Sequence, residues 1–224
     1  MNDFRSYDLF NEEALAVRKT YVIHSADAIH SDITLIPEVG GLYAFSLKDP
    51  SVLAEPLARA GLAMDVMGLG QRPLIYIGAS GDSLRRRVRS HLRDDTQTSS
   101  FRMSLGALLT DQLALTVKPV RHKSVFGFLP QDEARLTAWM IQNLDVGVLP
   151  AVRPKALERR AITQSDPVLN IQGRRAHDAA WQVLLLRRRC LDKTAGEGVA
   201  WTPSAGDGGS EAGADLMAAL EAAT

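Results

Sequence analysis

The sequence predicts a mixed α/β fold in which short apolar strands alternate with amphipathic helices. Two runs, Leu42–Leu47 and Leu74–Ile77, have the length and the apolar or aromatic composition of buried strands. The second run leads into a strongly basic segment with leucine or valine every four residues, which is typical of a helix with one buried face. The 224 residues, 46% of them hydrophobic and 23% charged, suffice for one well-buried domain with additional segments.

The first part of the chain is predicted to hold an extension packed on the core, a strand, a helical segment and a second strand. In order these are 1–36, with helical character at Asn11–Lys19, then Pro37–Leu47, 52–67 and Leu74–Ile77. Gly40 and Gly41 mark a tight entry into the first strand.

The basic helix follows Asp82 and Ser83, either of which can cap its first turn. The apolar positions of Leu84–Leu92 define the buried face of this helix. Arg87 and His91 lie one position to the side of that face, at the border of the core.

The second part of the chain is predicted to contain further helices and two strands. We expect helices at Phe101–Leu109, Glu133–Leu144, from Pro154 to before Asp166, and His177–Leu191, with strands at Leu113–Val120 and Val146–Val152 and an extended piece at 168–170. Residues 194–224 are rich in Gly, Ala, Ser and acidic residues, which predicts a disordered acidic tail.

Charge and cysteine content exclude several classes of function. The formal net charge is zero, which argues against a general polyanion binder, although residues 1–193 alone carry 26 basic and 21 acidic residues. The single cysteine, Cys190, excludes an intramolecular disulfide and a thiolate metal cluster. With no secretory leader and no apolar run of about 20 residues, we expect a cytoplasmic protein without a membrane partner.

Two tripeptides and the basic helix resemble a known family. Gly41-Leu42-Tyr43 and Tyr76-Ile77-Gly78 resemble the paired tripeptides of the GIY-YIG nuclease domain, which lie on adjacent strands. In that family the next helix carries an arginine and often a histidine four residues later, and Arg87 and His91 match both type and spacing. The resemblance implies a small three-stranded antiparallel sheet flanked by helices.

The family also requires a metal-binding glutamate on a later helix. Glu158 is followed by Pro167 and Asn170 nine and twelve residues on, which resembles the GIY-YIG domain of bacterial excision-repair nucleases. Glu158 is therefore the implied ligand for Mg²⁺ (or Mn²⁺), Asn170 is implied to hold the site together, and Glu133 is the alternative metal ligand. Taken singly, the tyrosines, Arg87, His91 and Asn170 are more often structural, and Glu158 fits an ion pair as well as a metal site, so the resemblance depends on their combined order and spacing.

The resemblance implies domain boundaries as well as roles. The nuclease-like domain spans 37–175, with insertions near 49–71 and 111–153, and a C-terminal helix follows at 176–193. Tyr43 is implied to be the general base, and Tyr76 to position the water or the phosphate. Arg87 is implied to stabilise the transition state, and His91 to relay a proton or bind phosphate.

The same chemistry can be argued without the family. Phosphodiester hydrolysis needs a positioned water, a proton acceptor and positive charge where the phosphate becomes more negative. A single carboxylate suits Mg²⁺, which keeps several waters. A free phenol has a pKa of about 10, so Tyr43 would need a metal or another cation to act as a base.

The predicted function is a divalent-metal-dependent endonuclease acting on DNA. Phosphate contacts are expected from the arginines Arg85, Arg86, Arg89, Arg93 and Arg102. Specificity would come from the insertions, a homodimer or a partner protein. Two alternatives stay open: a catalytically inactive DNA-binding module of the same fold, and a dinucleotide-binding oxidoreductase suggested by the turn at 75–81, which lacks the third glycine.

Overall fold

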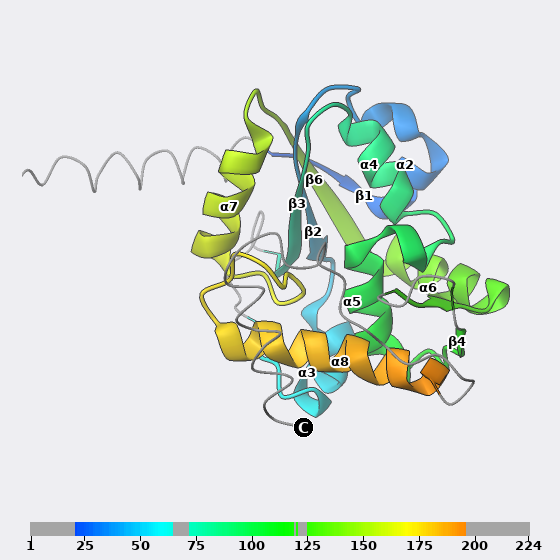
Figure 1. The fold of residues 1–224 in the computed structure, drawn as a ribbon. Coiled ribbons are helices and arrows are strands. Elements are labelled where there is room, and N and C mark those ends of the chain that lie inside the picture. Colours follow the sequence, from blue (N-terminus) through cyan, green and yellow to red (C-terminus); the bar gives the residue numbers. More distant parts are fainter. Residues whose placement is uncertain (1–20, 65–71, 119, 121–124, 196–224) are drawn as a thin grey trace, which may run out of the picture.

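A four-stranded antiparallel sheet organises the computed structural model of the protein, which describes residues 21–64, 72–118, 120 and 125–195 (Figure 1). Its spatial order is β1-β6-β2-β3, and the strands are β1 (Val22–Ser25), β2 (Gly41–Leu47), β3 (Leu74–Ser80) and β6 (Leu144–Pro150). The predicted α/β fold is confirmed, but the sheet has four strands rather than three, because β1 pairs with the outer edge of β6.

One of the two inner strands of the sheet, β6, comes late in the sequence. β6 pairs with β2 from Leu47↔Leu144 to Gly41↔Pro150, and its other edge pairs with β1. The stretch near 111–153, predicted as an insertion, therefore contributes a strand that is integral to the sheet.

Seven helices are present among the described residues. They are α2 (Ala26–Ser31), α3 (Ala54–Arg59), α4 (Leu84–His91), α5 (Ser100–Leu109), α6 (Pro130–Asn143), α7 (Pro154–Ser165) and α8 (His177–Ala195). Short 3-10 helices lie at Ile33–Leu35, Pro50–Leu53 and Thr96–Thr98.

Two elements are shorter than the sequence predicted. Of the helical segment expected at 52–67, the structure describes residues 52–64, and among these the helix ends at Arg59; Gly61 follows with a positive φ of 65° that suits a glycine after a helix. Among the described residues of the strand expected at Leu113–Val120, which omit residue 119, only β4 (Val117–Lys118) is a strand, and it pairs with β5 (Gly127–Phe128). Ala114 lies in the left-handed region with a φ of 48°, so the chain turns there instead of extending.

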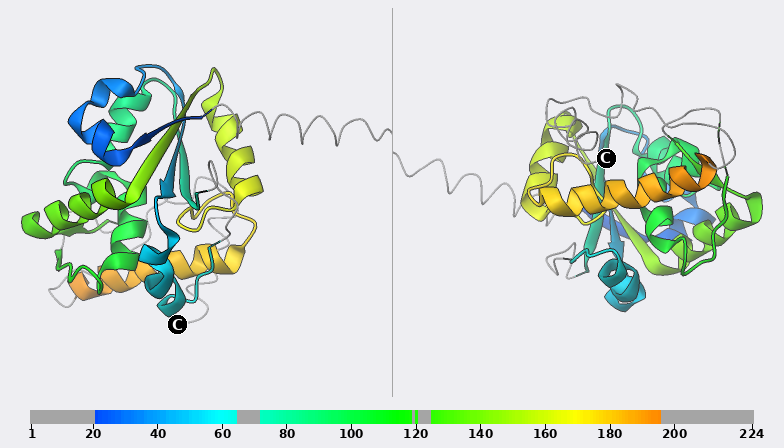
Figure 2. Two further views of the ribbon diagram at one scale, coloured as in Figure 1. Left: turned by 180° about the vertical axis from the view of Figure 1, so that it is seen from behind. Right: turned by 60° about the horizontal axis from the view of Figure 1, so that its bottom comes forward.

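The two faces of the sheet are covered by different helices. Leu42 and Ala44 of β2 face α7, where they pack with Ala161 and Ile162. Tyr43 and the alternate residues of β2 and β3 face the larger core on the side of α4 and α5 (Figure 1). α8 crosses the lower end of the sheet and packs beside α5 (Figure 2).

Some predictions fall outside the described residues. These are the helical pattern at Asn11–Lys19 and most of the acidic tail at 194–224. Among the helices that the structure describes, none combines the length and the apolar composition of a membrane span.

Candidate active site

Two tyrosines from adjacent strands form the centre of the candidate site. Tyr43 lies opposite Gly78 in the β2–β3 register, and Tyr76 lies opposite Phe45, so both tyrosines are on the same face. Their rings stack with centroids 6.4 Å apart. A Cβ at Gly78 would lie 2.1 Å from Tyr43 Oη, so only glycine leaves room for the hydroxyl there.

Helix α4 aims two basic side chains at the Tyr43 hydroxyl. Ser83 caps the helix by accepting a hydrogen bond from Arg86 N, as predicted for this position. The Nε–H of Arg87 donates to Tyr43 Oη over 3.3 Å, and His91 Nε2 lies 2.9 Å from the same oxygen. Arg87 is half-buried as predicted, whereas His91 is fully buried and so lies deeper than the expected border of the core.

Burial keeps the two hydrogen-bonded rings neutral. The pKa of the Tyr43 phenol is raised by burial and by the nearby Tyr76, while Arg87 opposes this shift. The pKa of His91 is lowered well below its ordinary value by burial, with Arg87 and Arg102 adding to the effect. Ionising Tyr43 at neutral pH therefore requires more positive charge than Arg87 alone supplies.

The outer edge of β3 brings the later part of the chain to the site. The side chain of Asn170 accepts from Ile77 N and donates to Ile77 O, both at 2.9 Å, and Leu169 N donates to Ile75 O at 2.9 Å. Two residues further along the same edge, Ala79 N–H donates to the carboxylate of Glu158. Residues 75, 77 and 79 all present backbone groups to this edge. Because α7 and the segment after it bond to these groups, they cover the edge of β3, which would otherwise be unpaired.

Asn170 is expected to stabilise the fold through this edge. In Asn170→Ala the buried N–H and C=O of Ile77 lose their partners, so we expect a loss of about 3 kcal/mol in the free energy of unfolding, measured by urea denaturation. Asn143→Ala is the control, because the Asn143 amide makes one partly buried bond to Trp139 O. Equal, small losses in the two variants would contradict a special role for Asn170.

The charge of the Glu158 carboxylate acts on Tyr43, Tyr76 and Arg87. Glu158 is half-buried, and burial raises its pKa, while Ala79 N–H, Arg87 and Lys155 partly offset the shift. No three His, Cys, Asp or Glu side chains gather as a metal-binding group in the part of the chain that the structure describes. A lone, incompletely neutralised carboxylate fits Mg²⁺ or Mn²⁺, which can take remaining ligands from water and phosphate, and does not fit a zinc site built from protein ligands alone.

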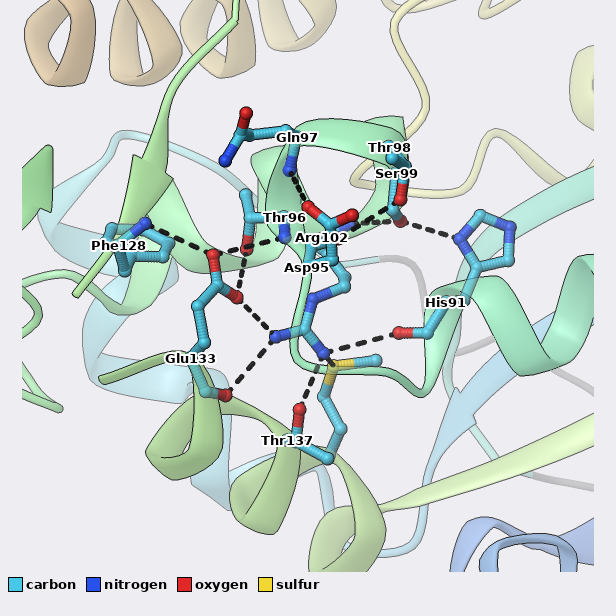
Figure 3. Close-up of polar contacts among 11 residues, drawn as sticks. His91, Asp95, Thr96, Gln97, Thr98, Ser99, Arg102, Phe128, Glu133 and Thr137 are labelled. Carbon is cyan, nitrogen blue, oxygen red and sulfur yellow. Dashed lines mark hydrogen bonds and ion pairs between the residues drawn. The ribbon is translucent and has the colours of Figure 1, made fainter. Parts of the chain in front are cut away.

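The alternative metal ligand and one predicted DNA contact instead pair with each other. Arg102 is fully buried, and its Nη2 lies 2.7 Å from Glu133 Oε2 (Figure 3). Glu133 also accepts from Thr96 N and Phe128 N, both at 3.1 Å. Because Arg102 is fully buried, the prediction that it contacts DNA is wrong. The Glu133 carboxylate is already occupied by its bonds to Arg102, Thr96 and Phe128.

The other predicted DNA-contacting arginines lie on or just after α4. Arg85 donates to Ile36 O and pairs with Glu38, and Arg86 pairs with Asp82. Arg89 and Arg93 are exposed.

Two residues around the site, Ser99 and Arg187, were not predicted from the sequence. Ser99 Oγ lies 2.6 Å from His91 Nδ1, and Arg187 on α8 bonds to Ser100 and Ser104 of α5. The charge of Arg187 lowers the pKa of Tyr76 against the dominant effect of burial. A serine just before a predicted helix is a visible capping signal, but nothing local links it to a histidine eight residues earlier.

The strand directions bear on the dinucleotide alternative. Each paired strand of the main sheet runs antiparallel to its neighbours, whereas a dinucleotide-binding unit needs a parallel strand–helix–strand crossover. The turn after β3 therefore does not belong to a dinucleotide-binding unit.

Comparison with known proteins agrees with the geometry. A family model described as the GIY-YIG catalytic domain matches residues 41–189, from the first residue of β2 into α8. A search of curated proteins and a search of solved structures gave no match. The match covers more than half of the chain and includes the tyrosine strands, α4 and α7, so this chain belongs to the GIY-YIG catalytic domain family, a family of nuclease-type domains.

Proposed function

We propose that the protein is an endonuclease that hydrolyses DNA phosphodiester bonds with Mg²⁺ or Mn²⁺. The observation that supports this most directly is the Tyr43 hydroxyl. It lies within hydrogen-bonding distance of both Arg87 Nε and His91 Nε2, while Glu158 is held at the edge of the strand that carries Tyr76. Nucleases of this family typically use divalent metal ions.

The proposed roles follow from the chemistry of each group. Tyr43 accepts the proton of the attacking water, and Tyr76 orients that water or the phosphate. Arg87 directs its fixed fork of donors at the phosphate oxygens as their charge increases. Glu158 holds the divalent ion, and Asn170 keeps the edge of β3 closed beside it.

A bound divalent ion would supply the positive charge that is needed to ionise Tyr43 at neutral pH. Burial raises that pKa, and Arg87 only partly offsets the rise. A divalent cation held by Glu158 would favour the phenolate and neutralise developing charge on the phosphate. The metal ion would therefore act on the general base, Tyr43, as well as on the phosphate.

The DNA itself is proposed to lie across the end of α4. Arg89 on α4 and Arg93 just after its end are exposed there, and both are suited to phosphate contacts. Because such contacts release counterions, DNA binding should weaken steeply as the salt concentration rises.

A plasmid-nicking assay tests the proposed activity. With Mg²⁺ or Mn²⁺ the protein should nick or linearise supercoiled DNA, EDTA should abolish this, and added metal should restore it. Arg87→Ala should lower the rate about 100-fold, because it removes a donor aimed at developing negative charge. Arg59→Ala on α3 is the matched control, since Arg59 only forms an ion pair with Glu55 on the surface.

Two results would contradict the proposal. Cleavage that persists in EDTA would exclude the metal-dependent reaction. Salt-dependent DNA binding without cleavage in any metal would instead favour the inactive DNA-binding module.

A further inference from the structure

His91 is held between two hydroxyl groups in a fully buried position. Its Nδ1 lies 2.6 Å from Ser99 Oγ, and its Nε2 lies 2.9 Å from Tyr43 Oη (Figure 3 shows the contact with Ser99). His91 and Ser99 have no exposed surface, and Tyr43 is 1% exposed. A neutral imidazole carries one N–H, so one of these contacts has the ring as donor and the other has it as acceptor.

The capping role of Ser99 restricts the direction of its bond to His91. Ser99 is the N-cap of α5, and its Oγ accepts the N–H of Arg102 at 3.0 Å. Among the described residues, the acceptor within reach of the Ser99 hydroxyl hydrogen is His91 Nδ1. If Nδ1 carried the proton instead, the buried hydroxyl hydrogen would have no acceptor, which is unfavourable.

We infer that Ser99 is a positioning residue that holds His91 as the Nε2–H tautomer. The chain of donors then runs in one direction, from Arg102 N–H to Ser99 Oγ, from Ser99 O–H to His91 Nδ1, and from His91 Nε2–H to Tyr43 Oη. His91 therefore donates a hydrogen bond to the tyrosine and does not remove its proton.

This direction changes what surrounds the tyrosine oxygen. Arg87 Nε–H already donates to Tyr43 Oη, so two N–H groups converge on it. Two donors favour the phenolate over the phenol, because hydrogen bonds to the charged form stabilise it. The hydrogen of the phenol is then directed away from both α4 side chains and toward the Tyr76 hydroxyl, which is hydrogen-bonded to Tyr43. The use of this phenolate in catalysis rests on the proposed function, whereas the assigned tautomer of His91 does not.

The charges around His91 agree with a neutral ring. Arg87 and Arg102 are the charged side chains that act on it, and together with burial they lower its pKa well below the ordinary value. A neutral ring has a single tautomer to assign at neutral pH.

Nitrogen NMR tests the tautomer directly and needs no substrate. Long-range ¹H–¹⁵N correlation spectra of the full chain distinguish protonated from unprotonated ring nitrogens. The chain has five histidines, and the His91 signals are those lost in His91→Gln. We expect an unprotonated Nδ1 and a protonated Nε2 in the wild type and in Ser99→Thr, which keeps the hydroxyl. A protonated Nδ1 in the wild type, with or without a protonated Nε2, would overturn the inference.

Cleavage kinetics test what the tautomer does. Ser99→Gly removes the hydroxyl at little cost to the helix cap, and we expect kcat to fall about 10- to 100-fold with KM for DNA nearly unchanged. Ser99→Thr should restore most of kcat. Equal losses in both variants, or a loss that follows thermal stability, would show that Ser99 is only structural. If the wild type cleaves no DNA under any condition, the proposed function fails while the NMR result still decides the tautomer.

Discussion

Glu158→Gln is expected to lower the rate of metal-dependent DNA cleavage about 1000-fold without unfolding the protein. Glutamine has nearly the same shape, and its amide oxygen can still accept the bond from Ala79 N–H. It carries no charge, however, so it binds a divalent cation poorly. The loss should therefore appear in cleavage and in metal binding rather than in folding.

The raised pKa of Glu158 determines whether this substitution raises or lowers the folding stability. Burial raises the folded-state pKa of Glu158, so the native fold favours the protonated carboxyl group, and its contribution to stability is fully present at pH values below the unfolded pKa. As the pH rises through the folded pKa, that stability is lost. At neutral pH the neutral glutamine should be at least as stable as the wild type.

Thermal unfolding gives an independent readout for the same position. Mg²⁺ or Mn²⁺ should raise the Tm of the wild type, because a ligand that binds the native state stabilises it, but should not raise the Tm of Glu158→Gln. Glu55→Gln is the control, since Glu55 is exposed on α3. An unchanged cleavage rate in Glu158→Gln would exclude Glu158 as the metal ligand.

Arg102→Met is expected to lower the free energy of unfolding by about 3–5 kcal/mol. The substitution leaves the Glu133 carboxylate buried, 4% exposed, without its positive partner. Arg102 also donates to Thr137 Oγ1 at 2.8 Å and to His91 O at 3.4 Å, so α4, α5 and α6 lose a shared contact (Figure 3).

Two further variants separate the charge from the packing. In Arg102→Met/Glu133→Gln no buried charge is left over, and the amide oxygen of the glutamine can still accept from Thr96 N and Phe128 N, so the double variant should recover much of the loss. Arg86→Met breaks an exposed ion pair with Asp82 and should cost less than about 1 kcal/mol. Urea denaturation measures all three, and a loss below 1 kcal/mol in Arg102→Met would contradict this account.

The family resemblance, together with local pattern, predicted the part of the site that lies on β2, β3 and α4. Strand alternation places Tyr43 and Tyr76 on the same face once the strands pair. The helical repeat places Arg87 and His91 one turn apart, and both contact the Tyr43 hydroxyl. Once β2 and β3 are paired, the period of each strand and helix is enough to place these side chains.

Partners distant in the sequence could not be predicted in this way. Arg102 and Glu133 each fit an ordinary helix in the sequence, and nothing in either helix reveals that the two face each other across the core. The same holds for β6, whose apolar run predicts a strand without its position between β1 and β2. Ser99 likewise has the residue type of a helix cap, and its contact with His91 depends on how α5 lies relative to α4.

The late position of β6 sets the order in which the nascent chain can complete the sheet. A chain leaves the ribosome from its N-terminus, so β2 and β3 can pair once residue 80 has emerged. β1 must wait for β6, which ends at Pro150, and the outer edge of β3 stays uncovered until Asn170. During translation, the strands that carry both tyrosines therefore exist before the segment that protects them from pairing with other chains.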